Sequence, residues 1–362
     1  MIEHLGTVLY GKQENKRCKM ASTTKIMTSV IVVENVKDIN EKTIISPKAA
    51  AIGGSRLGLH TNDEVSIKDL LYSLLMCSGN DAAIALAEYV AGTVPEFANL
   101  MNKKAEELNL KDTHFVTPHG LDEDEHYTTA YELALITDYA LNKEVIQQIV
   151  KTKSYTVTIN GNPKNINNTN ELLGYLQGVY GVKTGFTNGA NRCLVTSIKR
   201  GDMNVICVVL GADTKKDRGA DSIKLIEYIF SNFQMVDIEY MIQDNFGSLC
   251  DITKFNISKG INNNLQIDLE ENNITLYPVY KDNIKDIRVE TEVKKELNAP
   301  VHKEDVIGKL TVRIDDNVIY ELKILAKNDI RKKKVFDYYK NFVTNMSNWW
   351  GKGIDNRIEE YI

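Results

Sequence analysis

Hydrophobic residues at helical spacing dominate the first part of the chain. In "STTKIMTSVIVVENV", residues 22–36, apolar side chains follow a polar start, which predicts a helix with Ser22 at or near its N-cap. Apolar residues three and four positions apart predict a largely helical block from residue 46 to about residue 142. Ahead of the first helix, "TVLYGKQ" at residues 7–13 has the pattern of a strand that runs into a turn.

Beyond about residue 151, helical spacing gives way to alternation. β-Branched residues alternate with polar ones in "SYTVTIN", "RCLVTSIKR" and "MNVICVVLGAD", which predicts strands, and "RGADSIKLIEYIFSNF" predicts a helix after them. Short alternating runs separated by Asn-rich turns then predict a small all-β domain. We therefore place one domain at residues 1–234 and a second, β-rich domain at residues 235–329.

The last segment, residues 330–362, joins a basic cluster to a predicted amphipathic helix. After "RKKK", the apolar positions at helical spacing are Val335, Tyr339, Phe342, Met346, Trp349 and Trp350. Such a helix either packs on the β domain or lies in a membrane interface, where tryptophan partitions to headgroups and lysine meets anionic lipid. The basic cluster and the aromatic face favour the interface, so this segment is a candidate membrane anchor.

Composition excludes several classes of protein. The 362 residues, 43% hydrophobic and 26% charged, suffice for two domains with separate cores. Because 44 Lys and Arg residues stand against 49 Asp and Glu residues, no basic excess is present to neutralise a nucleic acid, and DNA and RNA are discounted as partners. The five cysteines include no C-x-x-C pair, which indicates neither a zinc ribbon nor a disulfide framework.

Ser22 and Lys25 are the first candidates for chemistry, because residues three apart lie on one face of a helix. A serine nucleophile needs a base within hydrogen-bond reach. Lysine serves as that base when burial or a second cation lowers its pKa from about 10.4. The spacing alone is weak, since Ser22 also suits a helix cap and Lys25 a solvated first turn.

Ser78 and Asn80 are the second pair of candidates. They interrupt the apolar helical stretch "LLMCSGNDAAIALA", where polar surface residues are hard to place. Either residue also suits the cap of a helix that begins at Asp81.

The third candidate motif is Lys183-Thr184-Gly185, at a predicted strand before a glycine-containing turn. In an ordinary hairpin, Lys183 would be solvated and Gly185 would only relieve steric strain in the backbone. Glycine there also lets another backbone approach closely. Lys183 is the candidate second cation beside Lys25, provided that the fold brings the two together.

The three motifs, in this order, form a set typical of penicillin-binding proteins and β-lactamases. The longer stretches "GTVLYGKQENKRCKMASTTKIMT", "HFVTPHGLDEDEHYTTAYELA" and "NNTNELLGYLQGVYGVKTGFTNGANRCLV" resemble the D-alanyl-D-alanine carboxypeptidases among the low-molecular-mass penicillin-binding proteins, serine peptidase family S11. The resemblance covers about residues 6–233, and the β domain and tail are similar to the C-terminal half of that family.

The resemblance implies an α+β fold. A penicillin-binding/β-lactamase-like transpeptidase domain, with an antiparallel sheet flanked by helices and a helical block, would precede the small all-β domain and the C-terminal amphipathic helix. It also implies a serine-type D-Ala-D-Ala carboxypeptidase that removes the terminal D-alanine from peptidoglycan stem pentapeptides through an acyl-enzyme. β-Lactam antibiotics would acylate the same serine, and neither a metal nor an organic cofactor is required.

The resemblance assigns catalytic roles to four residues. Ser22 would be the nucleophile and Lys25 its base. Ser78 would relay a proton towards the leaving D-alanine, and Asn80 would hold the substrate amide or the lysine.

Further residues would bind the substrate. The Lys183-Thr184-Gly185 strand would receive the peptide as an added strand, while its lysine and threonine bind the terminal carboxylate. Backbone N–H groups of Ser22 and Phe186 would form the oxyanion hole. Arg218 matches a family arginine near the substrate carboxylate, although it equally suits a solvated charge at a helix start.

Two other functions stay open on the sequence. A class A type β-lactamase shares the first and third motifs but carries a deacylating glutamate well before the third. The only similar stretch, "NELL" at residues 170–173, lies too close to Lys183, and the β domain also argues against this class. A non-catalytic β-lactam- or peptidoglycan-binding protein would keep the pocket without turnover, but all three motifs are retained.

A metal site is weighed for "HFVTPHGLDEDEH", which places His114, His119 and His126 beside four acids. Their spacing fits no zinc pair of the HExxH kind. We expect His119 and Gly120 to shape a loop and His126 to pack before the following helix, with no metal bound.

The expected location conflicts with the start of the chain. The substrate is assembled outside the cytoplasm, which implies the extracytoplasmic face of the cell membrane or the cell wall. The first residues lack the apolar run of a secretory signal, and no stretch has the roughly 18 uninterrupted apolar residues of a spanning helix. Because the family has more sequence ahead of "GTVLYGK", we expect a truncated or misassigned start that carried the signal and a first strand; the alternative is a defective protein.

Overall fold

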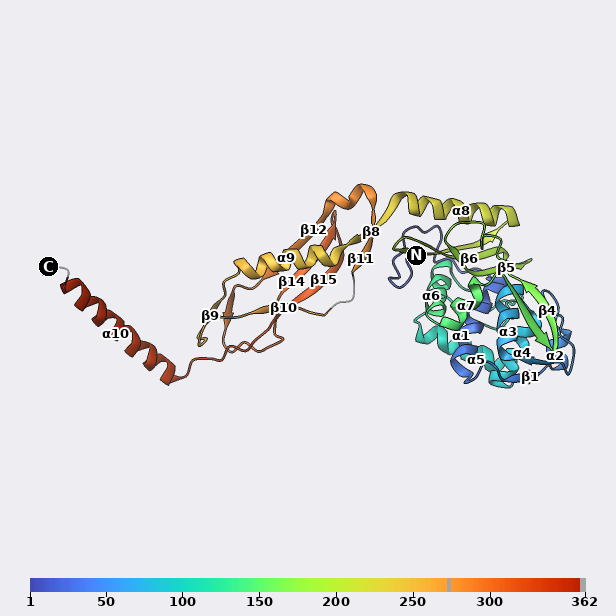
Figure 1. The fold of residues 1–362 in the computed structure, drawn as a ribbon, viewed down its shortest axis with the longest axis horizontal. Helices are drawn as coiled ribbons and strands as arrows, with labels where there is room; N and C mark the ends of the chain where they lie inside the picture. The colour runs from blue at the N-terminus through green and yellow to red at the C-terminus, as the bar shows by residue number, and fades with distance from the viewer. Residues whose placement is uncertain (272–274, 359–362) are drawn as a thin grey trace. The chain divides into compact units, whose positions relative to one another are not determined.

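A computed structural model describes residues 1–271 and 275–358, with side chains described as far as residue 346 apart from that gap. The chain divides into two compact units, Met1–Asn232 and Phe233–Ile362, each with its own hydrophobic core. The first unit combines helices with antiparallel strands, and the second is rich in strands (Figure 1). This content is the α+β mixture that the hydrophobic pattern predicts.

The first unit contains eight α-helices among its described residues. They are α1 (Lys25–Asn35), α2 (Pro47–Ala51), α3 (Ile67–Tyr72), α4 (Asn80–Ala91), α5 (Val94–Glu107), α6 (Ala130–Leu141), α7 (Glu144–Lys151) and α8 (Lys215–Asn232). A 3-10 turn, η1 (Ala21–Thr24), precedes α1, and a π-turn, η2 (Ser73–Cys77), precedes α4. The strands are β1 (Lys42–Ile44), β2 (Glu64–Ser66), β3 (Ser154–Ile159), β4 (Asn162–Asn167), β5 (Val179–Thr187), β6 (Asn191–Arg200) and β7 (Met203–Ala212).

The sheet that carries the Lys-Thr-Gly motif is antiparallel, with strand order β5-β6-β7. Helix α8 contacts β6 and β7 from one side, while α6 and α7 lie on the other (Figure 1). Because both faces are covered, residues 193–198 of the central strand β6 are all buried. The sheet therefore holds β5 at a fixed position in this unit.

Helix α1 lies at the centre of the helical block. It contacts α4, α5, α6 and α7, and each of its residues from Lys25 to Val32 is buried. A helix surrounded on all sides is normally apolar all round. Lys25 is the charged exception, so its amine needs partners inside the protein.

Ser22 lies near the N-cap of α1, as predicted, but the cap itself is Thr24 and Ser22 belongs to η1. The predicted strand at residues 7–13 is wrong, because these residues form no strand. Part of this segment faces residues 206–212 of β7 across a groove of about 980 Å³, so it has no neighbour with which to form a ladder.

The second unit is built from short strands and two α-helices in its described part. Its strands are β8 (Phe233–Asp237), β9 (Asn256–Ser258), β10 (Ile267–Leu269), β11 (Leu276–Tyr280), β12 (Ile287–Val293), β13 (Glu296–Asn298), β14 (Val306–Ile314) and β15 (Asn317–Ala326). Four of them form an antiparallel sheet in the order β10-β15-β14-β12. The other elements are α9 (Ile238–Ile252), the 3-10 helix η3 (Lys281–Asp286) and α10 (Val335–Ile358).

Helix α9 lies in a range for which only strands were predicted, so that part of the prediction is wrong. Ile238, Ile242 and Phe246 recur every four residues and are buried, and the helix contacts β12. The Asp237 side chain caps the helix by accepting a hydrogen bond from Tyr240 N at 3.0 Å. The helical period is therefore present in the sequence but is short and surrounded by alternating runs.

The predicted C-terminal helix is present as α10, and its apolar side chains are exposed. Val335 is 88% exposed, Tyr339 65%, Phe342 62% and Met346 54%. The side chains of Trp349 and Trp350 lie outside the described residues. None of the helices in the described part of the chain has both the length and the apolar character needed to cross a bilayer.

Candidate active site

The Ser22 hydroxyl and the Lys25 amine are in direct contact. Ser22 is the second residue of η1 and Lys25 the first residue of α1, so the helical rise places both on one face. Lys25 Nζ lies 2.9 Å from Ser22 Oγ. Ser22 is half-buried, whereas Lys25 is fully buried. The hydroxyl is thus accessible while its neighbouring amine is shielded from water.

Two further oxygens hold the Lys25 amine. Nζ lies 2.8 Å from Asn80 Oδ1 and 2.7 Å from the backbone oxygen of His119. A neutral amine has two N–H bonds and one lone pair. With its hydrogens donated to Asn80 and His119, the lone pair faces Ser22, whose O–H then donates to it. The geometry suits a lysine that removes the serine proton.

Burial lowers the pKa of Lys25 well below its ordinary value, and the charge of Lys183 lowers it further. Burial also lowers the pKa of Lys183, to about 7, with Cys77 opposing the shift and Arg218 adding to it. The fold therefore brings Lys183 close enough for its charge to disfavour the protonated form of Lys25.

Gly120 lets the loop that carries the His119 carbonyl approach the serine. Its φ angle is +82°, in the left-handed region that favours glycine, and a Cβ atom there would lie 1.9 Å from Ala21 O. A loop-shaping role for His119 and Gly120 is predicted from the sequence, but the contact of the His119 carbonyl with Lys25 is not. In the sequence, only the glycine indicates that the loop approaches another part of the backbone.

Ser78 and Asn80 lie in the turn between η2 and α4. Ser78 has φ +63°, and its N–H donates to Ser73 O across the π-turn. The N-cap of α4 is Gly79, so neither candidate caps the helix by its side chain. Instead, the Asn80 side-chain amide contacts Lys25 through Oδ1 and donates from Nδ2 to the backbone oxygen of Gly53 at 2.8 Å. The alternative in which Ser78 or Asn80 only caps a helix is therefore wrong.

Asp81 fixes that same loop and was not singled out from the sequence. Its fully buried carboxylate accepts backbone N–H bonds from Leu57, Gly58 and Leu59 at 2.8–3.1 Å. These bonds hold the loop over the N-terminus of α4, and with it the carbonyl that binds Asn80.

The Lys183-Thr184-Gly185 motif lies on β5, next to the serine. A Cβ atom at Gly185 would be 3.1 Å from Met20 O, so the strand packs closely on the residues before η1. Lys183 is buried and its Nζ donates to Thr184 O at 2.9 Å. The Thr184 hydroxyl lies 2.8 Å from that of Thr169.

The two remaining sequence candidates differ in their surroundings. Phe186 is 47% exposed, and the Arg192 guanidinium lies 3.5 Å from its ring centroid. Arg218 is buried rather than solvated: it forms a 2.5 Å ion pair with Glu171 and donates to Cys193 O at 3.3 Å. Glu171 belongs to the "NELL" stretch, so the glutamate of that stretch is paired with an arginine.

The three histidines of the loop make hydrogen bonds through their rings. His126 lies 2.8 Å from Thr24 Oγ1, and His119 Nδ1 accepts from Leu121 N at 3.1 Å. Burial, with nearby positive charges, lowers the pKa of His119 to about 3 and that of His126 to about 4, which keeps both rings neutral at physiological pH. These contacts agree with packing roles.

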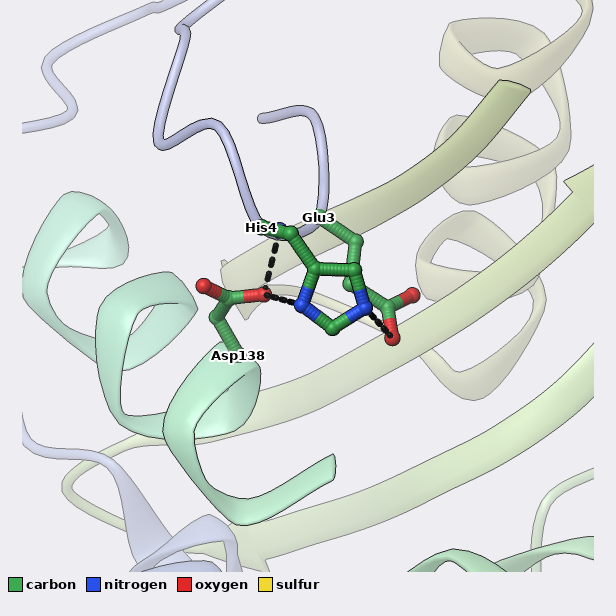
Figure 2. Close-up of side chains that lie close together, drawn as sticks. All are labelled: Glu3, His4 and Asp138. Atoms are coloured by element: carbon green, nitrogen blue, oxygen red, sulfur yellow. Dashed lines mark hydrogen bonds and ion pairs between the residues drawn. The ribbon is translucent and has the colours of Figure 1, made fainter. Parts of the chain in front are cut away.

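Among the described residues, one group has the donor atoms for a metal ion: Glu3, His4 and Asp138. Figure 2 shows the His4 ring between the two carboxylates, with Nε2 3.6 Å from Glu3 and Nδ1 3.8 Å from Asp138. His4 N also donates to Asp138 at 2.8 Å. The two ring nitrogens face different carboxylates, so the contacts of this group join the N-terminal segment to α6.

Comparison with protein families gives two matches. Residues 2–214 match the model described as D-alanyl-D-alanine carboxypeptidase, peptidase S11. Residues 252–332 match the C-terminal domain of penicillin-binding protein 5. The two matches fall in the two compact units and agree with the α+β prediction.

Characterised relatives match over nearly the whole chain. The D-alanyl-D-alanine carboxypeptidase DacF of Bacillus subtilis is 34% identical over 349 residues, which cover 95% of this chain and 87% of that protein. The carboxypeptidase DacA of Haemophilus influenzae is 31% identical, with 91% of this chain and 84% of that protein covered.

Solved structures agree with these relatives. Penicillin-binding protein 5 from Haemophilus influenzae has a TM-score of 0.74 and 29% identity, covering 91% of this chain and 95% of that one. The carboxypeptidase DacD from Francisella tularensis has a TM-score of 0.73 and 27% identity, covering 92% of each chain. None of these comparisons supports the β-lactamase alternative. The protein therefore belongs to the peptidase S11 family of D-alanyl-D-alanine carboxypeptidases, the penicillin-binding hydrolases of cell-wall synthesis.

Proposed function

We propose that the chain removes the terminal D-alanine from peptidoglycan stem pentapeptides through an acyl-enzyme on Ser22. The observation that carries this proposal is the contact of the fully buried Lys25 amine with Ser22 Oγ at 2.9 Å. The other two acceptors of that amine, on Asn80 and His119, leave its lone pair for the serine proton.

In acylation, Lys25 takes the proton from Ser22 as the serine oxygen bonds to the carbonyl carbon of the penultimate D-alanine. Backbone N–H groups of Ser22 and Phe186 stabilise the oxyanion that develops. The C–N bond to the terminal D-alanine then breaks, and Ser78 relays a proton to the leaving amine. Asn80 keeps the lysine aligned. Water hydrolyses the ester, with Lys25 again accepting a proton and Ser22 regaining its own.

The terminal carboxylate of the substrate binds near Lys183, Thr184 and Arg218. Since β5 is the outer strand of its sheet, an extended peptide adds to it by main-chain hydrogen bonds. Gly185 lets β5 pack closely on the residues before η1, which keeps the strand that receives the peptide next to Ser22. The carboxylate favours the protonated form of Lys183, whose lowered pKa otherwise weakens its charge in the free enzyme.

Incubation with a pentapeptide ending in D-Ala-D-Ala is expected to release one D-alanine per peptide. A fluorescent penicillin is expected to form a long-lived adduct of one molecule per chain. The leaving group of a β-lactam stays attached to the opened ring, so it remains in the site and shields the ester bond from water. Mass spectrometry of the digested adduct should place the label on Ser22. Rapid turnover of the penicillin without D-alanine release would instead indicate a β-lactamase, and an adduct without peptide turnover a binding protein.

We also propose that the enzyme acts on the extracytoplasmic side and touches the membrane through α10. At 100° per residue, the exposed apolar residues of the described part of α10 fall on one face, and its polar residues on the other. The helix follows the basic segment at residues 331–334, which suits an anionic lipid surface.

Deleting the residues after Asp329 is expected to abolish co-sedimentation with vesicles of phosphatidylglycerol and phosphatidylethanolamine while D-alanine release in solution persists. A variant with Tyr339→Ser, Phe342→Ser and Met346→Ser should lose binding as well, because the apolar face is removed. Its matched control, Asn341→Ser with Asn345→Ser on the polar face, should bind normally. Unchanged sedimentation of the deletion variant would rule out this anchor.

A further inference from the structure

A short segment beside β5 contacts two of the groups assigned to the substrate carboxylate. Thr169 Oγ1 lies 2.8 Å from Thr184 Oγ1, and Glu171 Oε1 lies 2.5 Å from Arg218 Nη2. Neither Thr169 nor Glu171 was singled out from the sequence for a role in the site. Two residues of one turn thus meet a hydroxyl and a guanidinium that would both bind the substrate.

The segment is held in place independently of the arginine. Asn170, buried between them, donates from Nδ2 to Gly181 O on β5 at 2.8 Å and accepts from Leu172 N at 3.1 Å. Thr169 N donates to Met76 O in η2 at 3.0 Å. Because these bonds fix the backbone, the point from which the Glu171 side chain extends does not depend on its pairing with Arg218.

The pairing of Glu171 with Arg218 is incomplete. The guanidinium offers five N–H bonds in a planar fork and commonly grips a carboxylate by two of them. Here one terminal nitrogen reaches Glu171 and the other reaches Cys193 O, while Nε of Arg218 and Oε2 of Glu171 are buried without a hydrogen-bond partner. Buried polar groups are normally satisfied, so the Nε–H of Arg218 is a donor left for a further anion.

We propose that Glu171 is a specificity-determining residue that competes with the terminal carboxylate of the substrate for Arg218. The proposal rests on the proposed function, in which that carboxylate binds near Lys183, Thr184 and Arg218. The side chain of Arg218 is only 4% exposed and that of Glu171 25% exposed, so their charges act in a poorly solvated site. An incoming carboxylate therefore meets an arginine already neutralised by a residue of the enzyme, and binds less tightly than it would to the free guanidinium.

The test is Glu171→Gln, assayed with two substrates that share the acyl part. One carries a C-terminal carboxylate, and the other is a neutral ester without it. We expect the KM of the carboxylate substrate to fall roughly tenfold, the size of effect that one nearby charge has in a partly solvated site, with little change in kcat. The kinetics of the neutral ester should not change.

The matched control is Glu227→Gln, which removes an equal charge from the other arginine–glutamate pair that involves α8. Arg200 contacts Glu227 at 2.5 and 3.0 Å, and this pair has no part in the site. Its kinetics with both substrates should equal those of the unmodified enzyme. Glu171→Asp, one methylene shorter, should lower the KM of the carboxylate substrate by a smaller factor and covers the case in which the glutamine variant does not fold.

The outcomes separate this proposal from the proposed function. If Glu171→Gln raises the KM of the carboxylate substrate, or alters both substrates equally, Glu171 only supports Arg218 and the competition is refuted. If the unmodified enzyme turns over neither substrate, the proposed function fails instead. Thermal unfolding of each variant shows whether a kinetic change accompanies a loss of stability.

Discussion

Replacing Ser22 by alanine is expected to abolish both penicillin labelling and D-alanine release. The nucleophilic oxygen is lost, so no acyl-enzyme forms, and turnover should fall by at least about 10⁴-fold. The fold should persist, because Lys25 keeps its bonds to Asn80 and His119. Labelling with fluorescent penicillin and a D-alanine assay measure the two effects.

Ser29→Ala is the matched control for this variant. Ser29 lies one helical turn beyond Lys25 on α1 and is buried, with its hydroxyl donated to Ile26 O at 2.7 Å. Its replacement removes a serine hydroxyl from the neighbouring helix without touching the Lys25 amine, so labelling should be normal. Penicillin labelling that survives in the Ser22→Ala variant would show that another residue is the nucleophile.

Replacing Lys25 by glutamine is expected to slow acylation by about 10²- to 10⁴-fold, the usual contribution of a positioned general base. Lys25→Arg should be impaired to a similar degree, because arginine keeps the charge but does not lose its proton in the accessible pH range. The two variants together show whether Lys25 acts as a base or only contributes a positive charge. Pre-steady-state acylation by penicillin gives the rate directly.

The pH dependence of the same rate carries a second signature. A base acts in its neutral form, so acylation should be slow below the pKa of Lys25 and increase as the pH rises through it. Since burial and Lys183 lower that pKa, the rise should occur well below the ordinary lysine value. In both Lys25 variants the rise should disappear. Lys42→Gln, which removes a lysine exposed on the surface, should leave rate and profile unchanged. Full activity in Lys25→Arg would eliminate the general-base role.

Local sequence patterns predicted most elements near the site, for a physical reason. The burial of α1 on all sides, of one face of α8 and of both faces of β6 is reflected in the order of their apolar residues. The pattern failed where an element depends on a distant partner. Residues 7–13 alternate like a strand but face β7 only across a groove, and α9 was hidden among alternating runs.

The sequence by itself determined which side chains are available for catalysis: the spacing of Ser22 and Lys25, and the motifs at Ser78 and Lys183. Only the tertiary structure decided how those groups are tuned. The partners of the Lys25 amine come from 55 and 94 residues away, and one of them is a backbone carbonyl. Every residue has such a carbonyl, so no sequence pattern marks the one that will be used. Likewise, the lowered pKa of Lys25 and the pairing of Arg218 with Glu171 arise from burial and through-space charge, which exist only once the helices and the sheet have packed.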